Sequence, residues 1–277
     1  MANVRLGLLL GTRGLLLKAQ REGTPLDPAP VLELAERAEA AGLDSVWVGD
    51  SLVSKPRLEP VAMLAAIAAR TKRVKLGTAV LLPALRPVVP LAHSLATVDV
   101  LSGGRLLIAA GVGGAFNADQ QQDWAAAGVD KGTRAGRLTE MVQVMKRLWT
   151  GEPVTFLGKH FTLDDITLLP RPIQPGGVPL LLATHYKTGS ETQARRAARY
   201  GDGVMGITDS PEEYTHMWEA VAGFARQEGR DPDALERAYY MTVHIGDDPA
   251  AAKAEGEEFL MGYYKVNHWG GNWGPWG

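Results

Sequence analysis

The strongest constraint on the fold of this chain is a repeated alternation of short apolar runs with amphipathic helical stretches. Apolar strands that alternate with helices form a parallel sheet, and about seven such units favour a TIM (β/α)8-type barrel over an open sheet. The predicted strands cover residues 4–10, 45–49, 74–82, 105–112, 178–183, 203–207 and 238–245. The predicted helices cover residues 31–41, 59–71, 87–101, 134–149, 189–200, 211–228 and 249–265.

One stretch, residues 151–175, departs from this alternation. Its apolar residues Val154, Phe156 and Phe161 are followed by a proline-rich connector, which predicts a hairpin insertion. No linker or shift in composition divides the chain, so we expect a single domain over residues 1–277.

Composition excludes several classes of function. The net charge is −2 and the isoelectric point is about 6.3, so no basic surplus favours nucleic acid or an anionic membrane as a partner. The absence of cysteine excludes disulfides and thiolate catalysis. No stretch approaches the ~20 apolar residues of a membrane span, and the start does not resemble a signal peptide. We therefore expect a cytoplasmic enzyme that acts on a small molecule.

Polar and small residues gather where the predicted strands end, which is the active-site face of such barrels. Asp50 follows a buried strand. Its structural explanation is that it caps the next segment or pairs with an arginine, and its functional one is that it contacts the cofactor or serves as an ordered proton donor. His185 and His244 are the imidazoles at this face, so the candidate catalytic residues are Asp50, His185 and His244. The candidate cofactor-binding residues are Asp50, Thr78, Ala79, Val80, Gly111, Val112, Gly113, Gly114, Thr184, Gly189 and Ser190.

Three of these groups also have plain structural explanations. Residues 76–80 are consistent with a strand that packs under helices, and residues 111–114 with a glycine turn, since they lack the spacing of a dinucleotide fingerprint. Ser190 and Gln193 fit a capping box, although the same helix start could bind a phosphate with help from Lys187. No paired-histidine motif supports a metal site, so we predict none.

Six segments together resemble the luciferase-like superfamily of flavin-dependent oxidoreductases. They are residues 35–50, ending in GLDSVWVGD; residues 71–80, ending in LGTAV; ATVDVLSGGRL at 96–106; GVGG at 111–114; residues 137–151; and AARYGDG at 197–203. The resemblance implies a TIM barrel that binds FMN or the deazaflavin coenzyme F420. It also implies a bulge at residues 78–80, with a cis peptide between Ala79 and Val80 behind the flavin ring, and a phosphate at the helix that begins near Gly189.

The resemblance leaves three functions open. We place first a monooxygenase that uses reduced FMN and oxygen on a small organic substrate, with a separate flavin reductase as an expected partner. The alternatives are an F420-dependent dehydrogenase or reductase that transfers hydride, and a flavin-binding protein without turnover. In the hydride-transfer case Asp50, His185 and His244 are the candidates for acid–base work.

Two departures from the family pattern carry further expectations. Many members have Asp-His after the second strand, whereas this chain has Asp50 and Ser51, so a histidine carried over from that position is absent. Members usually continue beyond a Gly-Pro-Trp-Gly segment with a helix, a strand and a closing helix, but this sequence stops at Gly277. We therefore expect an incomplete barrel. Either the chain is trimmed, which we favour, or the strands at 4–10 and 238–245 are bridged by a second subunit or by the aromatic tail. We also expect a homodimer.

Overall fold

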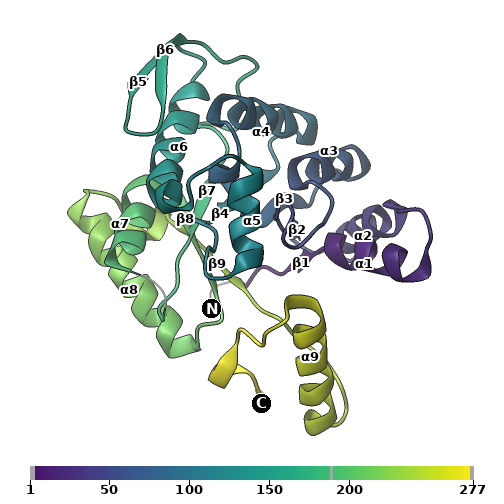
Figure 1. Cartoon of the computed structure of the whole chain (residues 1–277). Coiled ribbons are helices and arrows are strands. Elements are labelled where there is room, and N and C mark those ends of the chain that lie inside the picture. The colour runs from purple at the N-terminus through teal and green to yellow at the C-terminus, as the bar shows by residue number, and fades with distance from the viewer. Residues whose placement is uncertain (1–3, 188–189, 275–277) are drawn as a thin grey trace. The chain divides into compact units, whose positions relative to one another are not determined.

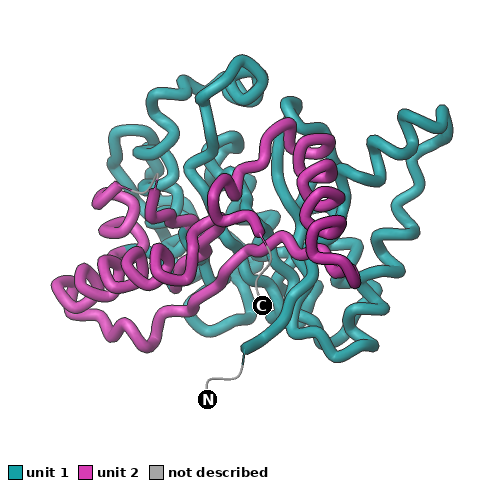
Figure 2. Tube along the Cα trace, turned by 90° about the horizontal axis from the view of Figure 1, so that it is seen from below, with its two compact units in different colours: residues 1–182, 200–202 teal, residues 183–199, 203–277 magenta. Residues whose placement is uncertain are grey.

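A computed structural model of the chain describes residues 4–187 and 190–274. Contacts group the chain into two compact units (Figure 2). Unit 1 comprises Met1–Leu182 and Tyr200–Asp202, and unit 2 comprises Ala183–Arg199 and Gly203–Gly277. The single domain over the whole chain stays a prediction.

Unit 1 is built on parallel strands in the order β1-β2-β3-β4-β7 (Figure 1). The strands are β1 (Gly7–Leu9), β2 (Ser45–Val48), β3 (Lys75–Leu81), β4 (Leu106–Ala110) and β7 (Leu180–Ala183). The helices are α1 (Thr12–Glu22), α2 (Ala29–Ala40), α3 (Pro60–Arg70), α4 (Val88–Ser102), α5 (Ala118–Ala126) and α6 (Arg134–Leu148). Every residue of β4 is buried, as expected for a central parallel strand covered on both faces.

The predicted insertion in unit 1 is an antiparallel hairpin of β5 (Val154–Leu157) and β6 (Thr162–Ile166). Its turn is held by Glu140 of α6, whose carboxylate accepts the backbone N–H groups of Lys159, His160 and Phe161 at 2.8, 2.8 and 3.1 Å. The hairpin prediction is therefore confirmed.

Unit 2 contains the parallel pair β8 (Gly203–Ile207) and β9 (Glu236–Tyr240). Its helices are α7 (Glu191–Tyr200), α8 (Pro211–Gln227) and α9 (Pro249–Tyr264). Helix α8 begins with a capping box in which Ser210 and Glu213 each accept the other's backbone N–H. Short 3₁₀ turns cover Pro83–Leu85, Lys131–Thr133, Pro232–Ala234 and Gly270–Asn272 in the two units.

The described residues contain all seven predicted parallel strands, but two helices were not predicted and several strand boundaries differ from the predicted ones. Helices α1 and α5 were not predicted. Helix α5 is polar and buries little apart from Asp123 and Trp124. The last strand ends at Tyr240 rather than at residue 245. Beyond it Met241, Val243 and Ile245 are 55%, 65% and 89% exposed, so their apolar alternation does not mark a buried strand.

Candidate functional site

Asp50 follows β2 in unit 1 and is engaged on both oxygens. The Arg86 guanidinium donates to Oδ2 at 2.6 Å and to Oδ1 at 2.9 Å, and the Leu82 N–H donates to Oδ2 at 2.9 Å. The Asp50 side chain is 0% exposed. Burial lowers the pKa of Arg86, but its hydrogen bonds to Asp50 outweigh this and raise the pKa overall. This bidentate pair favours the explanation that Asp50 pairs with an arginine. The pair holds the segment after β3 in place.

The end of β3 carries the predicted irregularity. The pairing of β3 with β4 shifts register between Thr78 and Leu81, and the peptide bond between Ala79 and Val80 is cis, which confirms that prediction. Thr78 is fully buried and donates its hydroxyl to the carbonyl of Ala109 at 2.8 Å. Ala79 and Val80 remain half-exposed, so this strand end presents a small side chain and backbone to the surroundings.

The glycine loop at residues 111–114 packs against α5. A Cβ on Gly113, whose φ is +79°, would lie 2.8 Å from the Trp124 ring, and one on Gly114 would lie 2.5 Å from the Gln120 amide. Trp124 Nε1 donates to the Gly114 carbonyl at 2.8 Å. These contacts explain both glycines without a ligand, so the glycine-turn alternative has direct support.

Asp123 of α5, which was not predicted from the sequence, is the shared acceptor of a hydrogen-bond network in unit 1. Its carboxylate is 5% exposed and accepts the N–H groups of Val53 and Ser54, at 2.6 and 2.8 Å, and the hydroxyls of Ser51 and Ser54, at 3.2 and 2.6 Å. Burial raises the pKa of Asp123, but these hydrogen bonds outweigh it and lower the pKa below its usual range. Ser51, at the position where the family resemblance implied a histidine, therefore anchors the loop after β2.

Three basic side chains of unit 1 interact here: Arg13 in the first turn of α1, and Lys55 and Arg57 in the loop after β2. Burial, together with the charges of Arg13 and Arg57, lowers the pKa of Lys55. The Arg57 guanidinium occupies the space that a Cβ on Gly49 would fill, and that Cβ position is 3.8 Å from the carbonyl oxygen of Ala79. A cation thus lies beside the strand end where the sequence predicts a flavin ring.

In unit 2, His185 and Asp209 form a titratable pair near the ends of β7 and β8. Burial lowers the pKa of His185, against the opposing effects of Asp209 and of a hydrogen bond with the Ile207 backbone. Burial raises the pKa of Asp209, which accepts the Tyr186 N–H at 3.2–3.3 Å. Both shifts favour the neutral forms. Asp209 was missed, although its place two residues after β8 is a signal that sequence could have used.

The remaining predicted residues of unit 2 have different surroundings. Thr184 is 1% exposed and its N–H donates to the Met205 carbonyl at 3.1 Å. The carbonyl of Ser190 accepts the Gln193 N–H, so α7 starts one residue after Ser190. Gly189 lies outside the described residues, and the phosphate site there stays a prediction. His244 does not end a strand: it is exposed, and its Nε2 lies 2.9 Å from Glu255.

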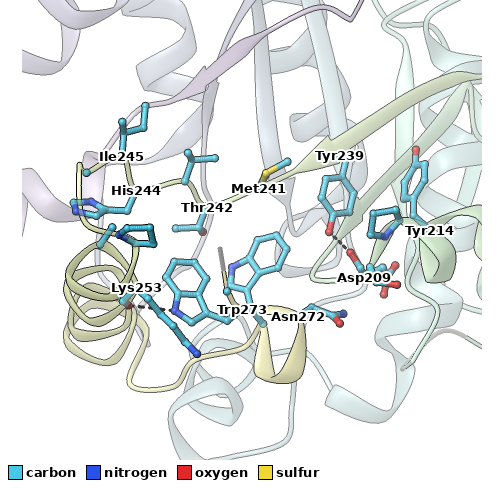
Figure 3. Close-up of a pocket in the computed structure, with 18 residues that line it drawn as sticks. Asp209, Tyr214, Tyr239, Met241, Thr242, His244, Ile245, Lys253, Asn272 and Trp273 are labelled. Atoms are coloured by element: carbon cyan, nitrogen blue, oxygen red, sulfur yellow. Dashed lines mark hydrogen bonds between the residues drawn. The ribbon is translucent and has the colours of Figure 1, made fainter. Parts of the chain in front are cut away.

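A cavity of about 700 Å³ lies within unit 2 (Figure 3). It is formed by the start of α8, the end of β9 and the segment after it, α9 and the aromatic tail. Trp273 of the tail donates to the Lys253 carbonyl at 3.3 Å and packs on Gly256, where a Cβ would lie 2.5 Å from the indole ring. Asn272 ties the tail to Thr208 and Glu213 at 2.8 Å each.

Residues 4–187 and 190–274 contain no group of three or more His, Cys, Asp or Glu side chains suited to hold a metal ion. None of the helices in this part of the chain has the length and apolarity that a membrane crossing requires.

Comparison with known proteins gives consistent matches. A family model described as luciferase-like monooxygenase matches residues 7–274. An F420-dependent glucose-6-phosphate dehydrogenase of Nocardia farcinica is 34% identical over 237 residues, which cover 81% of this chain and 67% of that protein. Its counterpart in Amycolatopsis mediterranei is 38% identical over 188 residues, or 64% and 53% of the two chains. The chain thus spans about half to two thirds of these curated relatives.

Solved structures agree with this assignment. A monooxygenase from Streptomyces bottropensis has a TM-score of 0.76 at 26% identity, over 95% of this chain and 78% of that one. An F420-dependent secondary alcohol dehydrogenase, solved with an F420–acetone adduct, has a TM-score of 0.73 at 28% identity, over 86% and 72% of the two chains. The predicted family and barrel-type fold class are confirmed. The chain belongs to the luciferase-like monooxygenase family.

Proposed function

We propose that this protein is an F420-dependent oxidoreductase that transfers hydride between the deazaflavin coenzyme and a small organic molecule. The similarity to F420-dependent dehydrogenases, at 34% identity over 81% of the chain, carries this choice. The FMN monooxygenase was the first prediction from the sequence, but the similar proteins support the F420-dependent alternative better. The monooxygenase match at 26% identity keeps the FMN reaction as the second candidate.

Unit 1 has features that fit a flat ring system at the end of β3. Ala79 ends at its Cβ and remains half-exposed beside Val80, so a planar group can approach the backbone there. Arg57 lies next to Gly49 on the side of the Ala79 carbonyl and can balance negative charge on the ring. The coenzyme, when bound, supplies a carbon that accepts or donates hydride. These residues would hold and orient it.

Hydride transfer from an alcohol also releases a proton from the hydroxyl group, and His185 is our candidate to receive it. Its lowered pKa keeps the imidazole neutral near pH 7, as a base must be. Asp209 stands next to it as the carboxyl that stabilises the protonated imidazole. Asp50 is unsuited to this role, because Arg86 and Leu82 occupy both of its oxygens.

Titration of the purified protein with F420 and with FMN tests the proposal. We expect saturable F420 binding that Ala79→Trp abolishes by filling the ring slot, while Ala66→Trp, on the exposed face of α3, binds like the wild type. Circular dichroism and thermal melting check that both variants fold. If the wild type binds FMN but not F420, and its reduced form consumes oxygen, the monooxygenase candidate replaces this proposal.

The other expectations for the whole protein stay predictions. A homodimer, a cytoplasmic location and a small-molecule substrate are compatible with the F420 proposal. A separate flavin reductase belongs to the FMN candidate, because F420 chemistry of this kind exchanges hydride with substrates directly.

A further inference from the structure

One edge of the sheet in unit 1 gathers basic side chains from the segments that follow two neighbouring strands. Strands β1, β2 and β3 pair in parallel and in this order, so the segments after them meet at the same edge. Arg13 lies in the first turn of α1, which follows β1, and Lys55 and Arg57 lie in the loop after β2. Parallel α/β sheets bind their ligands at this edge, so the three cations stand where a ligand is expected.

The guanidinium of Arg57 is held in place by the chain. Its Nε donates to the carbonyl of Lys55 at 3.1 Å, and the group fills the space beside Gly49, directly after β2. A Cβ on Gly49 would collide with the guanidinium and would lie 3.8 Å from the carbonyl oxygen of Ala79 in β3. An arginine that is already ordered loses less side-chain entropy when a ligand binds to it.

Arg57 differs from Arg86, which also lies near these strand ends. Arg86 donates to the carboxylates of Asp50 and Glu59 at 2.6–3.0 Å. Arg57 forms no ion pair within the described part of the chain, where Nε is the donor that it uses. Arg57 is half-exposed, and none of its nitrogens is among the buried side-chain atoms without a partner. Its terminal N–H groups are therefore accessible donors.

The carboxylates near this loop do not cancel its positive charge. Burial and the charges of Arg13 and Arg57 lower the pKa of Lys55, and Asp119 and Asp123 oppose this only in part. The oxygens of Asp123 already accept hydrogen bonds from backbone N–H groups and hydroxyls of the same loop. An anion placed beside Lys55 and Arg57 would reduce the repulsion among the cations.

The loop after β2 also carries apolar side chains at its surface. Leu52 and Val53 are 44% and 45% exposed, and the backbone N–H of Val53 is held by Asp123 at 2.6 Å. Exposed apolar side chains next to a cationic group suit a ligand that combines a hydrocarbon body with an acid group. This combination favours an organic anion over an inorganic one.

We propose that Arg57 and Lys55, reinforced by the charge of Arg13, bind the carboxylate or phosphate group of an organic substrate. Arg57 can place two parallel hydrogen bonds on such a group, and Lys55 adds a point charge. Binding of the acid group does not require the coenzyme, but its meaning as a substrate site rests on the proposed function. These residues belong to unit 1, as do Ala79 and Val80, where the coenzyme ring is proposed.

Calorimetric titration of the full chain without coenzyme tests the anion site. The probes are benzoate and phenyl phosphate, with benzamide and benzyl alcohol as uncharged counterparts of similar shape. We expect at least one anionic probe to bind at a single site, at least tenfold more tightly than either uncharged compound, and more weakly as salt is added. If neither anion binds, or if both bind no more tightly than the uncharged compounds, the inference is wrong.

Matched variants locate the anion. Arg57→Gln removes the charge and should weaken probe binding about tenfold or more, as expected for the loss of a charge-assisted hydrogen bond. Arg57→Lys keeps the charge and should retain more of the affinity, whereas Lys55→Gln should weaken binding several-fold. Arg171→Gln makes the same change as Arg57→Gln at an exposed position of unit 1, and should bind like the wild type.

Thermal melting checks that each variant folds. Equal affinity in Arg57→Gln and Arg171→Gln, whether both match the wild type or both fall below it, would show that Arg57 does not hold the anion, and would overturn the proposal.

Titration with F420 separates this inference from the proposed function. A substrate site predicts that the probe and F420 bind together. Displacement of the probe by F420 would show that acid groups of the coenzyme occupy the site, and would contradict the substrate assignment. Protein that binds F420 but neither anionic probe contradicts the anion site alone. Protein that binds a probe but not F420 contradicts the coenzyme proposal and leaves the anion site intact.

Discussion

The polar residues at the strand ends of unit 1 and those in the cavity wall of unit 2 differ in how they are partnered. In unit 1, Asp50, Thr78 and Asp123 all have hydrogen-bond partners from the chain itself. In the cavity of unit 2, Trp269 Nε1 and Thr242 Oγ1 have none. Groups that are already paired hold loops in place, whereas the two unpaired atoms, each almost inaccessible to solvent, tie no segment down. The contrast shows that a polar residue at a strand end is not by itself evidence of a binding site.

The largest effect should come from removing the centre of the unit 1 network. Asp123→Ala leaves two backbone N–H groups and two hydroxyls without their acceptor, so we expect a loss of about 3–5 kcal/mol in the free energy of unfolding. Asp119→Ala, on an exposed residue in the first turn of α5, should cost less than about 1 kcal/mol. Equal losses in urea denaturation would show that the network does not stabilise unit 1 as described.

A pair of tryptophans compares the two units directly. Trp149 in unit 1 is 3% exposed and donates from Nε1 to the Ala92 carbonyl at 3.0 Å, whereas Trp269 is 6% exposed and has no partner at Nε1. Replacement by Phe removes similar area at both sites, but only Trp149→Phe leaves a carbonyl unpaired. We expect it to cost about 1–3 kcal/mol more than Trp269→Phe. Similar unfolding free energies for the two variants would contradict the contrast.

The smallest effect concerns pH and His185. Its folded pKa lies below the ordinary value of 6.5, so the unfolded chain binds more protons, and stability should fall as pH drops below 6.5 towards the folded pKa. The slope for one proton cannot exceed about 1.4 kcal/mol per pH unit. Asp209, whose pKa is raised, opposes this fall once it takes up its proton.

Variants isolate this effect. His185→Asn should show a smaller decline over that range than the wild type, while His216→Asn, at an exposed position on α8, should not change it. Asp123, with a lowered pKa, adds its loss only as pH falls below 3.8. If the wild type, His185→Asn and His216→Asn lose the same stability between pH 6.5 and 3.8, burial of neutral His185 does not cause the decline in stability.

Much of the fold could be predicted because the signals are local. The strand at residues 203–207 was predicted with the bounds of β8, since glycine and polar residues flank a short apolar run. The hairpin at 151–175 was also correct, and the cis peptide before Val80, which the family resemblance implied, is present. Helix α5 was missed because its polar sequence has no apolar stripe, and its buried Asp123 acts through residues about 70 positions away.

The candidate sites were harder to predict because they depend on distant partners. Asp50 was recognised at a strand end, but Arg86, which engages it, is 36 residues away. The cavity of unit 2 brings together the segment after β9 and a tail that have no shared pattern in sequence. His244 was placed at the end of a strand because alternating apolar residues there resembled one, although several of them are exposed.

The contact between Gly256 and Trp273 should restrict which residues can occupy these two positions during evolution. A glycine inside a helix sacrifices about 1 kcal/mol relative to alanine, yet here any larger residue would collide with the ring of Trp273. The two positions therefore constrain each other by shape. Among homologues that keep this tail, an indole at position 273 should coincide with glycine at position 256, and lineages that lose the indole should be free to acquire alanine there. Such covariation of positions 256 and 273 would indicate selection for a closed wall on this cavity.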